Sequence, residues 1–488
     1  MSVLVHSDTW THTKLMGAYL GTAWESWEPH DFLDGWITHT KKNPTGGNGI
    51  FDESSTKVFD APSHRGTFCP VSPWNAFCPN VRIMLCRNAS AEIASRGFVS
   101  NRRSRRGSSS SRHRRAAVVS ASDSNNYTPK NASEKPVAII TGASSGLGLW
   151  TTKALVDKGY FVVMAVRDCA KGKAKATELN LDQNSFAVMR CELGDLQSVR
   201  EFATAFRRSA YVNNFQSLVC NAAVYLPNAT VPSYTKDGFE ECVGVNHLGH
   251  HLLSLLLLDD LAKAPDASMK RLIIVGSVTG NTNTLAGQVP PRAGLGDMSG
   301  LRNGFKNSDR NQGALIDGTR FIGAKAYKDS KLCNMLDIKA FAERYGESTG
   351  IKFSTMYPGC IAESNLFRNH TPFFRWLFPI LQKNVTKGYV SEQEAGERLA
   401  SIVYDPRYNE QGAYWAWKGG GDQLWDNYNN NDDKTRTIAF NNKPSREGRD
   451  MDKALEMFDI STEIVGYKPS ALDGVAKTFD RMLSSSSK

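Results

Sequence analysis

The segment KPVAIITGASSGLGLWTTKALVDKGYFVVMAVRD, residues 135–168, constrains the fold more than any other stretch of this chain. An apolar run, Val137–Ile140, predicts a buried strand, and Phe161–Val166 predicts a second one. Between them lie a glycine-rich turn and a helical pattern that extends to about Gly159. This order of strand, glycine turn, helix and strand predicts a dinucleotide-binding unit.

The glycines of the turn have separate predicted roles. Gly142 permits the tight turn, Gly146 lets backbone N–H groups approach a pyrophosphate, and Gly148 lets the helix pack closely on the strand. The pyrophosphate is expected at the helix N-terminus, where the dipole and free N–H groups favour anions. The predicted cofactor-binding residues of this turn are Gly142, Ser144, Ser145, Gly146, Leu147 and Gly148.

The end of the second strand indicates which dinucleotide is bound. An NAD site usually carries Asp or Glu there for the ribose 2′-hydroxyl, but here Val166 is followed by Arg167. Because a guanidinium binds phosphate in a bidentate manner, we predict NADPH. The alternative is that Arg167 only pairs with Asp168 on the surface.

Further apolar runs at 215–225, 271–277, 352–359 and 412–417 predict more strands, with helical patterns between them. We therefore expect an α/β fold with a doubly wound parallel sheet, and ligands at the carboxyl ends of its strands. Asn221 and Ala222 end one of these strands and are predicted to contact the cofactor. The longest apolar run, at 250–261, is too short to span a membrane and indicates a buried helix.

Tyr327 and Lys331 lie four residues apart in AKAYKDSKLCN, so on a helix they share one face. A Lys ammonium near a phenol lowers the pKa of the Tyr and makes it a usable proton donor. The same spacing also arises by chance on exposed helices, so the pair alone does not establish catalysis.

The net charge of +10 is concentrated in one segment, because residues 84–120 hold nine Arg and a single acid, Glu92. Together with abundant Ser and Ala, this composition predicts an organelle transit peptide, and a basic RNA-binding tail is the alternative. We expect residues 1–83 to be an extension upstream of a true start at Met84. The predicted divisions are 1–83, a transit peptide and linker at 84–130, and a single reductase domain at 131–488.

The nine cysteines form no C-x-x-C pair and their spacing is irregular, which favours a reducing compartment and predicts no metal site. His247, His250 and His251 have helical spacing without nearby acids, so we expect them to pack on a helix face.

Over residues 135–470 the chain resembles the short-chain dehydrogenase/reductase family. The motifs that carry the resemblance are TGASSGLG, CNAA, Asn246 in GVNHLGH, Ser277, and Tyr327-x-x-x-Lys331. The resemblance implies that Tyr327 donates a proton, and that Lys331 lowers its pKa and holds the nicotinamide ribose. It also implies that Ser277 hydrogen-bonds the substrate or the tyrosine and that Asn246 supports a lysine-bound water chain. Thr279 is a weaker candidate for the role of the serine.

The 50 residues from Ser277 to Tyr327 are a longer interval than is usual in that family, so we expect an insertion beside the active site that builds a pocket for a large ligand. This insertion, with YPGCIA, LFRNHTPFFRWLFP and TKGYVSEQEAGERLA, resembles the light-dependent protochlorophyllide oxidoreductases. That resemblance implies hydride transfer from NADPH to a C=C bond of protochlorophyllide, protonation of the neighbouring carbon, and light absorption by the pigment. It also implies a plastid location, in the stroma or on thylakoids.

Several further residues gain a predicted role from this resemblance. Cys360 matches a cysteine associated with activity, and the pigment-side candidates are Tyr225, Thr279, His370 and Cys333. For His370 the alternative is that it closes a lid. Cys333 is the weakest, because about 240° of helix rotation separate it from Tyr327. Glu192 replaces an Asp that often contacts adenine, and Glu363-Ser364 replaces a Thr pair near the nicotinamide amide, which puts those contacts in doubt.

Other functions and partners stay open at this stage. The alternatives are a short-chain reductase of a large hydrophobic carbonyl, or a non-catalytic pigment-binding protein that organises membranes. The aromatic run Phe367–Phe378 is consistent with a pocket cap, a lipid contact or an oligomer contact, and plain core packing is the alternative. We expect peripheral association with a plastid membrane and allow for a homo-oligomer. No nucleic-acid partner is predicted.

Overall fold

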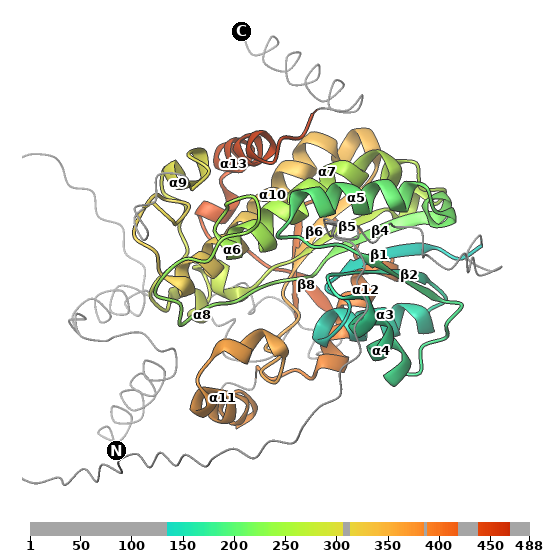
Figure 1. Cartoon of the computed structure of the whole chain (residues 1–488), viewed down its shortest axis with the longest axis horizontal. Helices are drawn as coiled ribbons and strands as arrows, with labels where there is room; N and C mark the ends of the chain where they lie inside the picture. Colours follow the sequence, from blue (N-terminus) through green and yellow to red (C-terminus); the bar gives the residue numbers. More distant parts are fainter. Residues whose placement is uncertain (1–133, 306–312, 385–387, 418–437, 469–488) are drawn as a thin grey trace, which may run out of the picture. The chain divides into compact units, whose positions relative to one another are not determined.

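The computed structural model describes residues 134–305, 313–384, 388–417 and 438–468. The predicted extension at 1–83 and the predicted transit peptide at 84–130 lie outside the described residues. The core is an eight-stranded sheet of order β3-β2-β1-β4-β5-β6-β7-β8 (Figure 1). The strands are β1 Val137–Thr141, β2 Phe161–Val166, β3 Phe186–Arg190, β4 Phe215–Cys220, β5 Arg271–Val275, β6 Lys352–Met356, β7 Ala413–Trp417 and β8 Ala439–Asn441.

All neighbouring strands from β3 to β7 are parallel, and only the β7–β8 pair is antiparallel. The predicted doubly wound parallel sheet is confirmed, and each strand expected from an apolar run is present. Two strands were missed. β3 is an edge strand with only partly buried side chains, so it lacks a continuous apolar run. β8 is three residues long and lies within a polar stretch.

Helices cover both faces of the sheet, as a doubly wound fold requires. The longer helices are α3 Gly146–Asp157, α4 Cys169–Glu178, α5 Leu196–Arg207, α7 Gly249–Ala262, α10 Gly323–Thr349, α11 Pro372–Asn384, α12 Glu392–Tyr404 and α13 Met451–Ile464. The short ones are α6 Glu241–Val243, a π-helical turn Gly244–Leu248, α8 Leu285–Gln288 and α9 Ser299–Arg302. The helices α3, α4 and α12 share one apolar core with the sheet, and α5, α7, α10 and α13 share the other.

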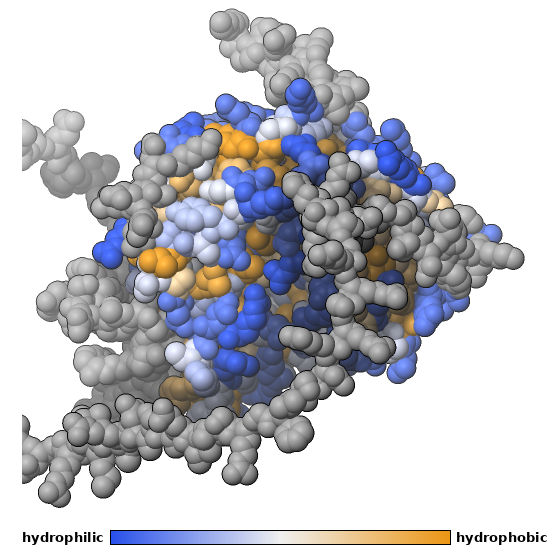
Figure 2. Space-filling view, viewed as in Figure 1, coloured by the Kyte–Doolittle hydropathy of each residue, from blue (hydrophilic) through white to orange (hydrophobic). Residues whose placement is uncertain are grey.

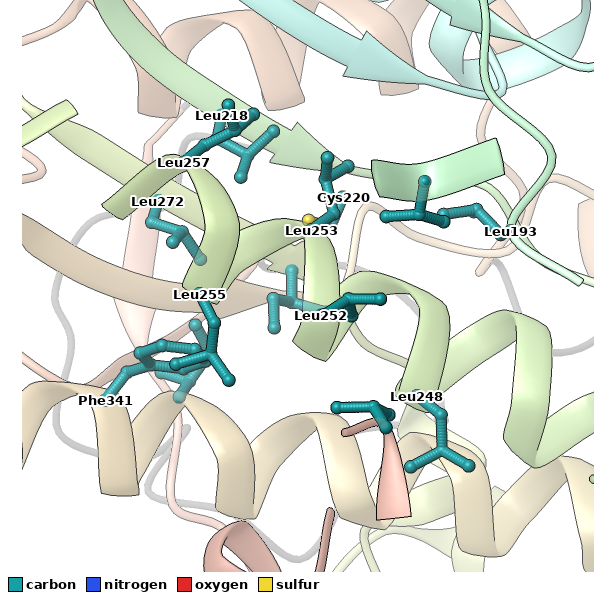
Figure 3. Close-up of a cluster of buried hydrophobic side chains, with 14 of the residues drawn as sticks. Leu193, Leu218, Cys220, Leu248, Leu252, Leu253, Leu255, Leu257, Leu272 and Phe341 are labelled. Atoms are coloured by element: carbon teal, nitrogen blue, oxygen red, sulfur yellow. The ribbon is translucent and has the colours of Figure 1, made fainter. Parts of the chain in front are cut away.

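The core on the α7 side is the larger of the two and explains why α7 is apolar almost all round. Leu248, Leu252, Leu253, Leu255 and Leu257 pack between β4, β5 and α10, so that most of this helix is buried (Figure 3). The buried helix predicted at 250–261 is therefore confirmed. His250 and His251 are buried on the same helix, and His247 is buried on the π-helical turn that precedes it.

The surface offers no extended apolar face in the view of Figure 2, where hydrophobic and hydrophilic residues alternate over the described part. Among the described helices, none combines the length and apolar character needed to cross a bilayer.

Candidate active site

A cleft of about 660 Å³ opens at the carboxyl ends of β1, β2, β4, β5 and β6. It extends from the end of β2 to the first turns of α11. Most residues predicted from the sequence line it, namely Gly142, Ser144, Ser145, Gly146, Leu147, Gly148, Arg167, Asn221, Ala222, Tyr225, Ser277, Thr279, Tyr327, Lys331 and Cys360. Asn246, Cys333 and His370 do not belong to the cleft wall described by these residues.

The turn between β1 and α3, residues 142–148, is here called the glycine turn. Gly142 has a φ of 66°, a conformation that side-chain-bearing residues rarely adopt. A Cβ on Gly148 would lie 2.5 Å from Asn221 Nδ2 and 2.7 Å from the carbonyl oxygen of Gly142. Ser145 gives the start of α3 no side-chain cap, which leaves the first N–H groups of this helix available to an anion.

A buried hydrogen-bond network that sequence reasoning missed holds the glycine turn against β4. Thr141 Oγ1 accepts from the N–H groups of Asn221 (2.8 Å) and Ala222 (3.0 Å) and lies 2.8 Å from His250 Nε2. His250 Nδ1 lies 3.1 Å from the carbonyl oxygen of Asn246 and must donate to it. Nε2 is then the acceptor for the Thr141 hydroxyl. Burial lowers the pKa of His250 to about 3, so the ring is neutral. The sequence feature that could have indicated this network is Thr141, a polar residue at the end of an apolar strand.

Two cations lie where β2 ends. Arg167 has a side chain that is 73% exposed, and its Nε lies 3.7 Å from Glu192 Oε2. Lys171, which was not predicted, lines the same end of the cleft. The ion pair of Arg167 is with Glu192 and not with Asp168, whose carboxylate caps α4 by accepting from the Lys171 N–H.

Tyr327 and Lys331 lie together on α10 at the centre of the cleft, and both are buried. Lys331 Nζ donates to the carbonyl oxygen of Val275 (2.8 Å) and lies 5.8 Å from the centre of the Tyr327 ring. Burial raises the pKa of Tyr327 above its ordinary value, and a hydrogen bond with Ser277 lowers it only in part. Burial lowers the pKa of Lys331 to about 8. The lowering of the Tyr327 pKa expected from Lys331 does not appear in this structure, where desolvation of the phenolate is the largest influence on that pKa.

Asn246 lies on the π-helical turn behind the cleft. Its side-chain Nδ2 donates to the carbonyl oxygen of Val224 (3.0 Å) and to Ser330 Oγ (3.0 Å), and its Oδ1 accepts from the Val224 N–H (2.8 Å). Both amide hydrogens are therefore used within the protein. The side chain therefore holds the chain next to Tyr225 in place, and its support of a lysine-bound water chain stays a prediction.

Residues 360–384, here called the lid segment, close the other end of the cleft. The ring of Tyr225 lies 4.4 Å from that of Tyr327 and 5.3 Å from that of His370. His370 in turn stacks on Phe374, with 4.0 Å between ring centres. His370 thus supports the lid segment from behind and does not line the cleft. The backbone of Cys360 is fixed by hydrogen bonds to Gly388 (3.1 Å) and Val390 (3.0 Å).

Comparison with known proteins connects this geometry to a family. The family model described as short chain dehydrogenase matches residues 136–289. Protochlorophyllide reductase, chloroplastic, of Daucus carota is 51% identical over 338 residues, which are 69% of this chain and 80% of the relative. Protochlorophyllide reductase A, chloroplastic, of Arabidopsis thaliana is 50% identical, covering 69% of this chain and 78% of the relative. Protochlorophyllide reductase, chloroplastic, of Chlamydomonas reinhardtii is 49% identical, covering 68% of this chain and 78% of the relative.

The chain belongs to the protochlorophyllide reductase family. It is therefore a short-chain oxidoreductase, and the family predicted from its motifs is confirmed.

The insertion that distinguishes this reductase has two parts with different roles. Leu285, Ala286 and Val289 line the cleft, as expected of a pocket-building insertion. The remainder joins the main core through Leu295, Met298, Leu301, Phe305 and Ile316. Lys325 on α10 anchors it by an ion pair with Asp317 (3.0 Å) and by donating to the carbonyl oxygen of Gly294 (2.7 Å). Most of the insertion is thus structural support for the reductase.

The structure also places Cys333 and Glu363, whose predicted contacts with ligands were weak or in doubt. Cys333 is fully buried in the main core, so its assignment to the substrate is wrong, and the helix rotation that made it the weakest candidate is the reason. Glu363 forms an ion pair with Lys383 (2.9 Å) and accepts from the Tyr389 hydroxyl (3.0 Å), while its neighbour Ser364 lines the cleft. Within the described ranges, no group of three or more His, Cys, Asp or Glu is placed to hold a metal ion.

Proposed function

We propose that this chain reduces protochlorophyllide to chlorophyllide with NADPH, in a light-driven step of chlorophyll biosynthesis in plastids. The observation that carries the proposal is the continuity of the cleft. One end has the glycine turn of a dinucleotide site, the other end has the aromatic lid segment, and Tyr327 and Lys331 lie between them. The 49–51% identity to reductases named for this pigment supports the same substrate.

NADPH is the cofactor that fits the cation pair at the end of β2. Arg167 and Lys171 both line the cleft at the position expected for a 2′-phosphate. The start of α3 would hold the pyrophosphate, with Asn221 and Ala222 fixed beside it by Thr141. Lys331, which has donated one N–H to Val275, has others left for the nicotinamide ribose.

In the proposed reaction, one carbon of a pyrrole C=C bond gains a hydride and its neighbour gains a proton. NADPH supplies the hydride when bound, and light absorbed by the pigment makes the macrocycle a better hydride acceptor. Burial raises the pKa of Tyr327, so the phenol stays protonated at neutral pH and holds the proton that the reduced carbon takes up. Ser277 orients the phenol, and the lid segment excludes water.

The pigment would lie between Tyr225 and Thr279 and the cluster in which Cys360 packs against Phe374 and Phe378. Its flat apolar ring system matches these aromatic walls. Its ionised propionate needs a cation, and Arg368 of the lid segment lines the cleft at this end. Cys360 is the proposed contact of the pigment at the start of the lid segment.

The proposal is tested by mixing the full chain with protochlorophyllide and NADPH in darkness and recording the red absorption band before and after a flash. We expect the band to shift to that of chlorophyllide only after light, and more weakly with NADH. A shift in darkness would contradict the light requirement. Pigment binding without any shift would favour a pigment-binding protein, and absence of pigment binding would favour a carbonyl substrate.

We also propose plastid import directed by residues 84–130 and a peripheral membrane contact through α11. Its outer face exposes Phe373 (68%), Trp376 (65%) and Ile380 (42%), a pattern typical of interfacial helices. Flotation of the full chain with vesicles of plastid lipids tests the contact, and Trp376→Ser should reduce it. Equal flotation of both proteins would contradict the assignment to α11.

A further inference from the structure

A carboxylate from α12, a distant part of the sequence, lies against the glycine turn. Glu392 is the first residue of α12, whose N-cap is Ser391. A Cβ placed on Gly146 would come within 3.3 Å of Glu392 Oε1. Gly146 is the first residue of α3 and lines the cleft. An acidic group therefore touches the same turn that is expected to receive the pyrophosphate of the cofactor.

Close packing between α3 and α12 fixes the position of this carboxylate. A Cβ on Gly396, one helical turn beyond Glu392, would lie only 2.5 Å from Trp150 Cβ, so the two helices are in direct contact there. The side chain of Trp150 also hydrogen-bonds the Glu392 carboxylate. Glu392 is thus held at the turn by its own helix and by a residue of α3, and it has little freedom to turn away.

The charges around Glu392 do not neutralise it. Among the described residues, no Lys, Arg or His forms an ion pair with Glu392. The nearby cations have other partners, because Arg398 pairs with Glu394 and donates to the carbonyl oxygen of Pro358, and Lys383 pairs with Glu363. Burial raises the pKa of Glu392 above its ordinary value, and the charge of Glu363 raises it further. The carboxylate therefore lies at the positive end of α3 with a hydrogen bond from Trp150 and with no ion-pair partner among the described residues.

We infer that the Glu392 carboxylate competes with the cofactor pyrophosphate at the start of α3 and thereby weakens dinucleotide binding. Cofactor binding then takes up a proton at this carboxylate. The inference rests on the proposed dinucleotide cofactor. Two anions at one helix N-terminus repel each other, and protonation of the carboxyl removes the repulsion. The consequence is a weaker hold on the dinucleotide, which favours release of the oxidised cofactor after each turnover.

The expected pH dependence has a definite sign. Binding of the pyrophosphate raises the pKa of Glu392 beyond its already raised value, so the bound state holds the proton over a pH range where the free state does not. Affinity for the dinucleotide therefore falls as pH rises through that range and is level below it. The cations at the other end of the site, Arg167 and Lys171, affect NADPH alone, through its 2′-phosphate.

The decisive variant is Glu392→Gln, which removes the charge and keeps an acceptor for Trp150. We expect about five- to tenfold tighter binding of both NADPH and NADH at about pH 8, with most of the pH dependence of NADH binding lost. NADH is the sharper probe because it lacks the 2′-phosphate, whose own titration would also change proton uptake. Glu397→Gln is the matched control on the same helix, since its side chain is exposed, and we expect unchanged affinities.

Dissociation constants of the full chain would be measured by nicotinamide fluorescence, and proton uptake by calorimetry in buffers of different ionisation enthalpy. Equal or weaker binding by Glu392→Gln, with proton uptake as in the parent chain, overturns the inference. If the variant does not fold, the parent chain still decides the matter, because NADH binding without proton uptake contradicts a titrating carboxylate at the pyrophosphate. A parent chain that binds neither dinucleotide would instead refute the proposed cofactor.

Discussion

The two ends of the cleft are built in different ways. At the glycine turn, the positions of the groups follow from backbone conformation and from contacts that leave no space for another atom, as at Gly142 and Gly148. In the lid segment, the positions follow from contacts between rings, because His370 stacks on Phe374 and also contacts Tyr225 from a distant part of the chain. The glycine turn is therefore sensitive to single atoms, whereas the lid segment should tolerate changes and adjust to a bulky ligand.

The largest expected effect lies where the two ends meet. Tyr327→Phe removes the hydroxyl that holds the proton and leaves the ring stacked near Tyr225. We expect protonation of the product to slow by about 10²–10⁴-fold, while both ligands bind within about twofold of the parent affinity. Single-turnover absorption after a flash measures this step. Unimpaired turnover with normal binding would show that another group donates the proton.

A single methyl group tests the glycine turn. In Gly148→Ala the new Cβ would lie 2.5 Å from Asn221 Nδ2, so the turn or β4 must shift. We expect NADPH binding to weaken by about 10- to 100-fold and the free energy of unfolding to fall by about 1–3 kcal/mol. Gly294→Ala is the control, since its Cβ would meet no described atom closer than 3.6 Å. Normal NADPH affinity in Gly148→Ala would mean that this end of the cleft is also adaptable.

Adjacent residues on opposite faces of α11 test the lid segment. Phe374 faces the cleft and stacks on His370, whereas Phe373 is 68% exposed. We expect Phe374→Ala to weaken pigment binding by about tenfold through lost aromatic contact, with NADPH affinity unchanged. Phe373→Ala should alter pigment binding by less than about twofold. Pigment titration in darkness measures both, and equal effects would place the pigment elsewhere.

The smallest expected effect concerns the unpredicted cation at the end of β2. Lys171→Met should weaken NADPH binding by about three- to tenfold, leave NADH binding unchanged and reduce the salt dependence of NADPH affinity. Lys175→Met is the control on the same helix, because Lys175 pairs with Glu178 outside the cleft wall. Equal losses for both dinucleotides would mean that Lys171 contacts something other than the 2′-phosphate.

Sequence reasoning was more successful for the sheet and the glycine turn than for the lid segment. The parallel strands could be predicted because strands buried on both faces have continuous apolar runs, and β3 and β8 were missed because an edge strand and a three-residue strand do not. The turn glycines, Arg167 and the Tyr327–Lys331 pair all line the cleft, as predicted. Each of them could be placed from the strand, turn or helix that carries it. His370 and Cys333 were assigned by motif, and the packing of α11 and α10 placed them elsewhere.

The sequence by itself determined the sheet, the glycine turn, the family and the central Tyr–Lys pair, because local backbone chemistry and hydrophobic pattern specify these features. Only the tertiary structure decided that Asn246 supports the chain beside Tyr225, that His250 joins Thr141 to the cofactor end, and that Glu392 lies on Gly146. It also decided the direction in which the pKa of Tyr327 moves. The physical reason is that desolvation and hydrogen-bond partners depend on which distant residues surround a group, and residue spacing carries no information about that.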